Sequence, residues 1–263
     1  MNMQRLRNLL PDLSLRFVPV WRRNFLVWRK LAGASILGNI ADPMIGLVAL
    51  GFGLGALLPQ VEGVSYVQYL AAGSICVSTM NAATFEALYS AFSRMHVQRT
   101  WDGMLNAPLT LDDVLLDELT WAATKSLMSG CAILGVAAAL GLAHGPACLL
   151  ILPVVLLSGL AFAAIALIFN ALARGYDFFT YYFTLCVTPM TFLSGVFFPV
   201  TQLPDWLRAV SGILPLTHAV ELVRPLLLGH WPPAAATHLV ALAFYAVACM
   251  GVAMILTRRR LLT

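Results

Sequence analysis

The run from Phe178 to Phe198 most constrains this chain, because its 21 residues include no charged side chain. A helix of about 20 apolar residues spans the hydrocarbon core of a bilayer, which is about 30 Å thick. Comparable apolar segments lie near residues 35–58, 66–91, 122–143, 147–172 and 235–257. We therefore expect an all-α integral membrane protein with six transmembrane helices, surrounded by a lipid bilayer.

The composition agrees with a membrane protein rather than a soluble one. Charged residues make up 11% of the chain and hydrophobic residues 60%, whereas soluble domains carry about 25% charged residues. The cysteines all fall inside apolar segments without the spacing of metal ligands, so we expect free, buried thiols and no metal site. They are Cys76, Cys131, Cys148, Cys186 and Cys249.

The distribution of basic residues predicts the orientation. Of the 16 lysine and arginine residues, only Arg208 and Arg224 fall on one side of the predicted membrane. Cytoplasmic segments are enriched in lysine and arginine, so both termini are expected in the cytoplasm and no nucleic-acid binding is inferred from the net charge. The basic residues on the cytoplasmic side are Arg5, Arg7, Arg16, Arg22, Arg23, Arg29, Lys30, Arg94, Arg99, Lys125, Arg174, Arg258, Arg259 and Arg260.

The N-terminal segment contains a predicted amphipathic helix from Val20 to Leu31. At 100° per residue, Trp21, Phe25 and Trp28 share one face. Basic residues occupy the rest of the helix surface, and they are Arg22, Arg23, Arg29 and Lys30. This pattern is typical of an interfacial helix with its aromatic face toward lipid; the alternative is a solvated basic tail.

The second connection, residues 94–121, is the longest on the predicted cytoplasmic side. A polar helical stretch from Arg94 to Asp102 continues the second span, and Asn106-Ala-Pro108 interrupts it. The pattern Thr110-Leu-Asp-Asp113 then predicts a helix N-cap, followed by acidic residues that favour the positive end of the helix. We expect a firm protrusion, with a solvated acidic connector as the alternative.

The segment after Pro199 predicts short helices instead of a full span. Pro215 and Pro225 interrupt the sequence, so no piece reaches the length of a membrane crossing. We expect short re-entrant or surface helices between the fifth and sixth spans.

Ionisable residues near or within the membrane raise the free energy of the folded chain unless they are paired or in contact with water. His218, Glu221 and Arg224 are spaced so that neighbours can pair along one helical face. Such residues either stabilise the bundle or line a gate or pathway; the five candidates are Asp42, Glu86, His218, Glu221 and Arg224. An aromatic cluster in the fifth span fits an interface belt or a surface for stacking sugars, and comprises Phe178, Phe179, Tyr181, Tyr182 and Phe183.

Three motifs together resemble the C-terminal signature of the transmembrane subunits of type-2 ABC exporters. They are Phe192-Leu-Ser-Gly-Val-Phe-Phe-Pro-Val200, Leu203-Pro-Asp-Trp-Leu207 and Leu214-Pro-Leu-Thr-His-Ala-Val-Glu-Leu-Val-Arg224. Within that family, the sequence of these motifs is most similar to the nodulation protein J branch, which is associated with lipo-oligosaccharide export. The resemblance covers most of the chain.

This resemblance implies one permease domain over residues 1–263 in a bacterial inner membrane. Residues 1–34 would be the cytoplasmic N-terminus, 35–257 the membrane domain and 258–263 the cytoplasmic tail. It also implies that the second connection binds the ATPase subunit, through Arg94, Arg99, Trp101, Met104, Leu105, Asp112 and Asp113. A homodimer with the first and fifth spans near its seam is implied too, and small residues such as Gly46, Gly51, Gly53 and Gly55 would permit close helix contact there.

The chain itself lacks a nucleotide site. Its two lysines, Lys30 and Lys125, do not stand in the phosphate-binding pattern G-x-x-x-x-G-K-[ST]. ATP would therefore be bound by a separate ATPase chain, and no cofactor is expected in this one. Permeases for drugs or polysaccharides and an ion-coupled secondary transporter are alternatives; an intramembrane enzyme is disfavoured because neither H-E-x-x-H nor G-x-S-x-G occurs.

Overall fold

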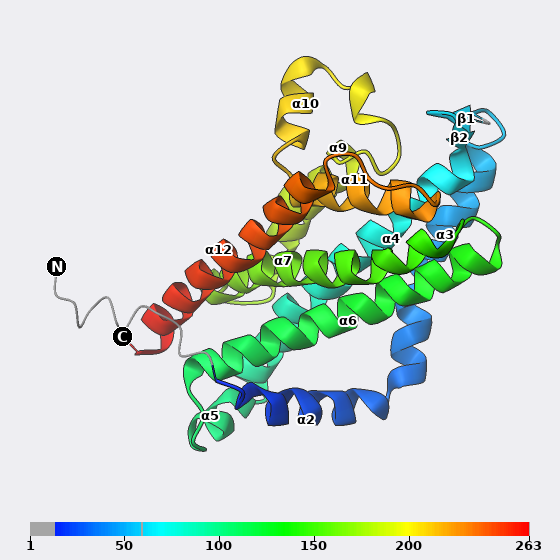
Figure 1. Cartoon of the computed structure of the whole chain (residues 1–263). Helices are drawn as coiled ribbons and strands as arrows, with labels where there is room; N and C mark the ends of the chain where they lie inside the picture. The colour runs from blue at the N-terminus through cyan, green and yellow to red at the C-terminus, as the bar shows by residue number, and fades with distance from the viewer. Residues whose placement is uncertain (1–13, 59, 263) are drawn as a thin grey trace.

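The computed structural model describes residues 14–58 and 60–262, which are almost entirely helical (Figure 1). The α-helices are α2 (Phe17–Arg29), α3 (Ala32–Gly53), α4 (Tyr66–Phe85), α5 (Thr100–Leu105), α6 (Leu111–Ala139), α7 (Ile151–Leu172), α8 (Asp177–Tyr182), α9 (Thr188–Leu193), α10 (Asp205–Ser211), α11 (Pro215–Leu227) and α12 (Ala235–Leu262). Three π turns are η1 (Glu86–Ser90), η2 (Ser93–Val97) and η4 (Phe183–Val187). Two 3-10 turns are η3 (Pro146–Leu150) and η5 (Val200–Gln202), and β1 (Gln60–Val61) pairs antiparallel with β2 (Val64–Ser65).

Among the residues that the structure describes, three helices are long and apolar enough to cross a bilayer, and these are Leu111–Ala139, Pro146–Leu172 and Ala235–Leu261. The other three predicted spans are also helical, but less regular. The first corresponds to α3, the second to α4 with η1, and the fifth to α8, η4 and α9. The all-helical membrane architecture is thus confirmed, and six crossings stay a prediction.

The helix α7 lies at the centre of the bundle, where it packs against α4, α6, α11 and α12. Glycines let α6 and α7 approach closely. A Cβ atom at Gly159 of α7 would lie 1.8 Å from Ser126 Oγ, and one at Gly130 of α6 would lie 2.6 Å from Val155. Close backbone approach through small residues is a common way to pack helices in membranes.

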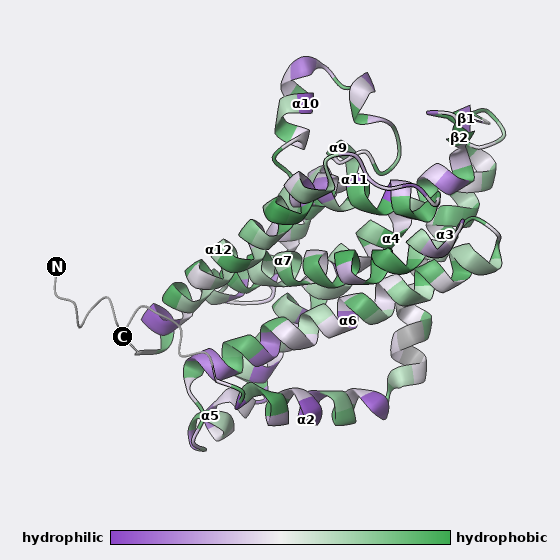
Figure 2. Ribbon diagram, viewed as in Figure 1, coloured by the Kyte–Doolittle hydropathy of each residue, from purple (hydrophilic) through white to green (hydrophobic). Residues whose placement is uncertain are grey.

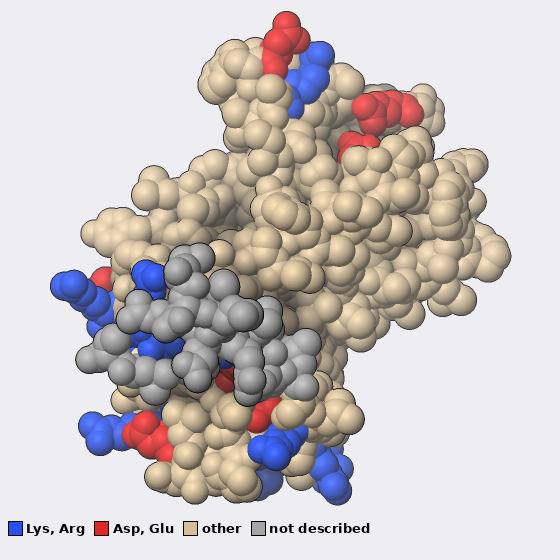
Figure 3. Space-filling view, turned by 60° about the vertical axis from the view of Figure 1, so that its left-hand side comes forward, with Lys and Arg blue, Asp and Glu red and all other residues tan. Residues whose placement is uncertain are grey.

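The two ends of the bundle differ in charge. The helices α2 and α5 and the C-terminal end of α12 share one end, while the β1–β2 hairpin and α10 lie at the other (Figure 1). Hydrophilic residues gather at these ends, and hydrophobic ones cover the middle of α7 and α12 (Figure 2). Lysine and arginine concentrate over the end that holds α2 and α5 (Figure 3). This distribution agrees with the charge asymmetry on which the predicted orientation depends.

The predicted short helices after the fifth span are confirmed as α10 and α11, which bend by 83° relative to each other. Pro215 occupies the first position of α11, where its missing N–H has no cost. Pro225, by contrast, does not interrupt the helix as predicted. It lies near the C-terminal end of α11, so only one late intrahelical hydrogen bond is lost.

The predicted N-terminal helix is present as α2, but its aromatic face is not directed toward lipid. The indole N–H of Trp21 donates to Thr124 Oγ1 at 3.0 Å, and that of Trp28 donates to Ser35 Oγ at 3.0 Å. Both rings also meet Trp121 of α6 edge to face. A tryptophan N–H away from water needs an acceptor, and α3 and α6 provide them. Arg22, Arg29 and Lys30 stay exposed, while Arg23 is partly buried.

Candidate functional site

The second connection forms a protrusion, as the sequence predicts. Thr110 and Asp113 make a reciprocal capping box: Thr110 N–H donates to Asp113 Oδ2 at 2.9 Å, and Asp113 N–H donates to Thr110 Oγ1 at 3.2 Å. On the other side of the break, α5 begins directly after Arg99, whose φ of +50° is left-handed. This backbone reversal turns the chain sharply and sets α5 at the tip of the protrusion.

The predicted ATPase-binding residues divide into an exposed group and a buried group. Arg99 and Leu105 are exposed, and together with Val97 and Asp102 they form what we term the tip surface. The others are buried, and these are Arg94, Trp101, Met104, Asp112 and Asp113. A solvated acidic connector is therefore wrong, because the carboxylates that begin α6 face the interior.

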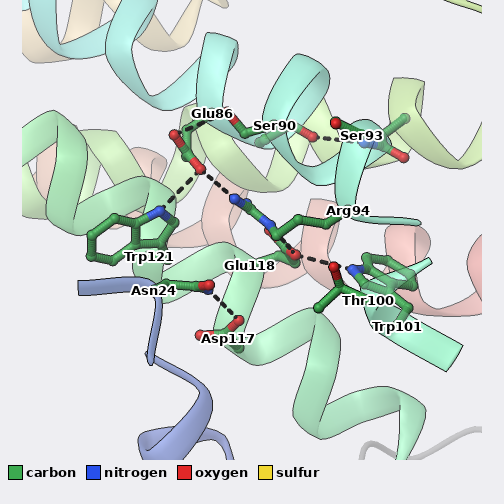
Figure 4. A network of polar contacts seen from close by, with 12 residues as sticks. Asn24, Glu86, Ser90, Ser93, Arg94, Thr100, Trp101, Asp117, Glu118 and Trp121 are labelled. Atoms are coloured by element: carbon green, nitrogen blue, oxygen red, sulfur yellow. Dashed lines mark hydrogen bonds and ion pairs between the residues drawn. The ribbon is translucent and has the colours of Figure 1, made fainter. Parts of the chain in front are cut away.

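A buried cluster lies directly behind α5 and is centred on Arg94 (Figure 4). Arg94 Nη1 donates to Glu86 Oε1 at 2.9 Å, and its Nε donates to Glu118 Oε1 at 2.8 Å. A further bond joins Arg94 Nη2 to Glu118 Oε2. Two indole N–H groups complete the set, from Trp101 to Glu118 Oε1 at 3.1 Å and from Trp121 to Glu86 Oε1 at 3.0 Å. We call these five residues the Arg94 cluster.

The electrostatics of the cluster favour a charged Arg94. Burial disfavours the guanidinium charge, but the carboxylates of Glu118 and Glu86 more than offset that effect, so the pKa of Arg94 is raised. The planar guanidinium meets Glu118 through two of its nitrogens, which is the geometry in which arginine binds a carboxylate most strongly. Nearby, Asn24 Nδ2 donates to Asp117 Oδ2 at 2.8 Å, which ties α2 to the same part of α6.

Glu86 and Arg94 both stand on π turns, η1 and η2, where the helix that follows α4 widens. A π turn weakens the regular backbone pairing and is frequent at functional sites. Asn170 of α7 compensates, because its Nδ2 donates to the carbonyl oxygens of Ala87 at 2.9 Å and Leu88 at 3.1 Å. Sequence reasoning missed Asn170; the signal was a lone amide side chain at the end of an apolar run.

Two adjoining cavities open beside the Arg94 cluster, and together we call them the hollow. The first has a volume of about 370 Å³ and the second about 480 Å³. Both are lined by Glu86, Tyr89, Ser90 and Lys125. Further polar lining of the first comes from Ser78, Asn81 and Ser129, and the second is also lined by Trp28, Arg94, Trp121 and Tyr176.

One wall of the hollow is aromatic and links the second and fifth predicted spans. Tyr89 stacks on Phe85 with ring centroids 5.4 Å apart and on Tyr176 at 6.0 Å. Phe85 also lies 4.7 Å from Phe183, centroid to centroid. Phe183 belongs to the predicted aromatic cluster, whereas Phe179 and Tyr182 are buried among helices. A surface of rings beside hydroxyl, amide and ionic groups can bind an amphipathic molecule.

The ionisable residues predicted to lie near or within the membrane have different surroundings. Glu86 lines the hollow, while the side chain of Asp42 lies outside the described residues. His218 does not pair with Glu221, because its Nδ1 lies 2.9 Å from Nδ1 of His238 on α12. The predicted pairing along one face of α11 is therefore wrong at this position.

Arg224 makes its contacts with groups other than Glu221. Its Nη2 donates to the carbonyl oxygen of Gly195, and its guanidinium carbon lies 3.7 Å from the ring centroid of Tyr69. Tyr69 O–H donates to the same carbonyl at 2.9 Å. Among the described residues Glu221 makes no ion pair. An aromatic face and a buried carbonyl accommodate the planar cation, so α11 is joined to α4 and to the turn after α9.

Comparison with known proteins identifies the family of this chain. The family model described as "ABC-2 type transporter" matches residues 16–228, which include α5, the Arg94 cluster and α11. The chain belongs to the ABC-2 type transporter family. Nodulation protein J of Bradyrhizobium diazoefficiens is 49% identical over 255 residues, with 97% of each chain covered. Nodulation protein J of Rhizobium meliloti is 48% identical over 253 residues, covering 96% of this chain and 97% of the relative.

A more distant relative carries the same kind of name. The inner membrane transport permease YadH of Escherichia coli is 20% identical over 202 residues, with 77% of this chain and 78% of the relative covered. The sequence-based family prediction is confirmed, including the nodulation protein J branch. This ABC-2 permease is a transport subunit rather than an enzyme, and its family implies pairing with an ABC ATPase.

Proposed function

We propose that this ABC-2 permease exports an amphipathic lipo-oligosaccharide across the bacterial inner membrane, driven by a separate ATPase chain that binds the ATP. The single observation that carries the proposal is the protruding α5, whose tip surface is exposed while its buried face contacts the Arg94 cluster beside the hollow. A partner that pushes on α5 would act on a polar and aromatic cavity. The substrate class is supported by the relatives named nodulation protein J.

The proposed topology has six crossings with both termini in the cytoplasm. Its support is the charge asymmetry, since most basic residues of the described chain lie toward the end with α2, α5 and the end of α12, as the face in Figure 3 shows. Arg258 on α12 pairs with Asp112 of α6, which joins the C-terminal end to the base of the protrusion. The ATPase, a cytoplasmic protein in this proposal, would then meet α5 on the positive side of the membrane.

A homodimer is part of the proposal, and α3 offers a surface for it. A Cβ atom at Gly46 or Gly53 would meet nothing within 4 Å, whereas Gly51 packs against Val67 within the chain. Bare glycine surface on a membrane helix permits a second helix to approach closely. Native mass spectrometry of the active complex should show two permease copies; a single copy would contradict the dimer.

The contact with the ATPase is tested by cross-linking from the tip surface. A Leu105→Cys variant, in a background without native cysteines, should form a disulfide or short cross-link with the co-expressed ATPase, since Leu105 is 39% exposed at the end of α5. The matched control is Trp206→Cys on α10, which is 68% exposed at the opposite end of the bundle and should not react with the ATPase. Absence of cross-links from Leu105 and the other tip positions, in an assembled complex, would sink the proposed contact.

A further inference from the structure

We infer that Arg94 is a positioning residue that transmits displacement of α5 to the wall of the hollow. The inference rests on the proposed function, because it needs an ATPase that moves α5. It adds a defined route, which runs from Trp101 through Glu118 and Arg94 to Glu86. Each step of this route is a contact between buried side chains.

The first step joins α5 to α6. Trp101 is only 2% exposed although α5 is a short, protruding helix, and its indole N–H donates to Glu118 Oε1 at 3.1 Å. Glu118 is fully buried, and the same oxygen accepts from Arg94 Nε at 2.8 Å. A shift of α5 therefore changes the position of a carboxylate that Arg94 binds through two nitrogens.

The second step joins Arg94 to Glu86 across two consecutive π turns. Arg94 Nη1 lies 2.9 Å from Glu86 Oε1, and the carboxylate is also held by Trp121 and by Ser90, whose Oγ donates to Oε2 at 3.2 Å. The backbone of η2 pairs Gln98 N–H with Ser93 O at 2.8 Å, five residues earlier. Because a π turn has one residue more than a regular turn, a helix can change its register there without unwinding.

The third step ends at the hollow itself. Glu86, Tyr89 and Ser90 all belong to η1, and all three line both cavities. Asn170 binds two carbonyls of the same π turn, so the turn is held from α7 on one side and by Arg94 on the other. Rotation of η1 would carry a carboxylate, a phenol ring and a hydroxyl group into or out of the hollow together.

A second buried ion pair at the same end provides the matched control. Arg258 of α12 pairs with Asp112 of α6, both largely buried, and neither residue lines the hollow or belongs to α5. If the Arg94 cluster served only to stabilise this end of the bundle, loss of either ion pair would have comparable consequences. A transmitting role predicts that only the route through Arg94 affects the response of the hollow to nucleotide.

The experiment uses the complete complex of permease and ATPase in lipid nanodiscs. A single reporter cysteine is placed in the hollow by Phe85→Cys, at a side chain that is 50% exposed, in a background without native cysteines. The rate of labelling by a charged maleimide is measured without nucleotide and after trapping with ATP and vanadate. The parent should label at clearly different rates in the two states. Trp101→Phe removes the indole N–H donor together with the pyrrole ring, and Glu86→Gln removes the charge that Arg94 meets and replaces one acceptor oxygen by an amide NH2.

We expect the parental labelling rates to differ by about tenfold or more between the two states and both variants to bring their ratio close to one, because the loss of a hydrogen bond to a buried charged group is an effect of about that size. Arg258→Gln should keep the parental ratio. The inference is overturned if Trp101→Phe and Glu86→Gln keep the parental ratio, or if Arg258→Gln abolishes it equally. A parent that assembles with the ATPase but shows no nucleotide response would overturn the inference and leave the ATPase contact standing. A chain that binds no ATPase would refute the proposed function itself.

Discussion

Replacing Arg94 with methionine is expected to lower the free energy of unfolding by about 3–5 kcal/mol, because two buried carboxylates lose their shared partner. The side chains of Glu86 and Glu118 are 9% and 0% exposed, so both carboxylates stay largely desolvated when the guanidinium is removed. Methionine keeps most of the length of the side chain, which separates the loss of charge from the loss of volume. Thermal unfolding of the purified protein in detergent measures the effect as a large drop in melting temperature.

Two further variants make this prediction specific. Arg99→Met removes a neighbouring, exposed arginine and should leave the melting temperature nearly unchanged. Combining Arg94→Met with Glu86→Gln and Glu118→Gln should recover part of the lost stability, since no uncompensated charge then stays buried. Equal melting temperatures for the parent and Arg94→Met would show that the cluster contributes little to the fold.

Replacing Arg224 with methionine is expected to have the second large effect, a loss of roughly 2–4 kcal/mol from one cation–π contact and one hydrogen bond to Gly195. Arg224→Lys should recover little, because an ammonium group cannot both lie flat on Tyr69 and donate to the carbonyl in the same way. Export should fall together with stability, since α11 would lose its contact with α4. Melting temperature and export rate are measured on the same preparations.

Glu221→Ala serves as the matched comparison, three residues away on the same helix. It should have a much smaller effect than Arg224→Met, since Glu221 makes no ion pair in the described part of the chain. Although the two residues are neighbours on α11, no ion pair joins them among the described residues, so the two substitutions should combine with little coupling energy. Similar losses for both single variants, with recovery in the double variant, would instead support pairing of Glu221 with Arg224.

The features that could be predicted from sequence depend on local chemistry. Thr110 and Asp113 stand three residues apart, so a capping box follows from their spacing alone. Pro215 at the start of α11 is likewise a local signal for a helix N-terminus. The apolar segments predicted the positions of the main helices, because bilayer thickness fixes the length of an uncharged run.

The partners of the charged residues could not be predicted, because they depend on tertiary contacts and on irregular helix geometry. At 100° per residue, Glu86 and Arg94 would be about 80° apart around a regular helix. The two π turns reduce this angle, so that the guanidinium of Arg94 can reach the carboxylate of Glu86. Arg224 and Gly195 are 29 residues apart in the chain, and no helical periodicity relates them. The spacing along α11 therefore predicted Glu221 as the partner of Arg224. In the folded chain Arg224 contacts Gly195 and Tyr69 instead.

The most direct test of the account is ATP-dependent transport by the reconstituted proteins. A radiolabelled lipo-oligosaccharide is offered to inside-out proteoliposomes that contain this permease with its ATPase, or the permease alone, each with ATP or with ADP. We expect accumulation only when permease, ATPase and ATP are present together, and no response to an imposed proton or sodium gradient. Accumulation by the permease alone, driven by an ion gradient without ATP, would contradict the account and identify a secondary transporter.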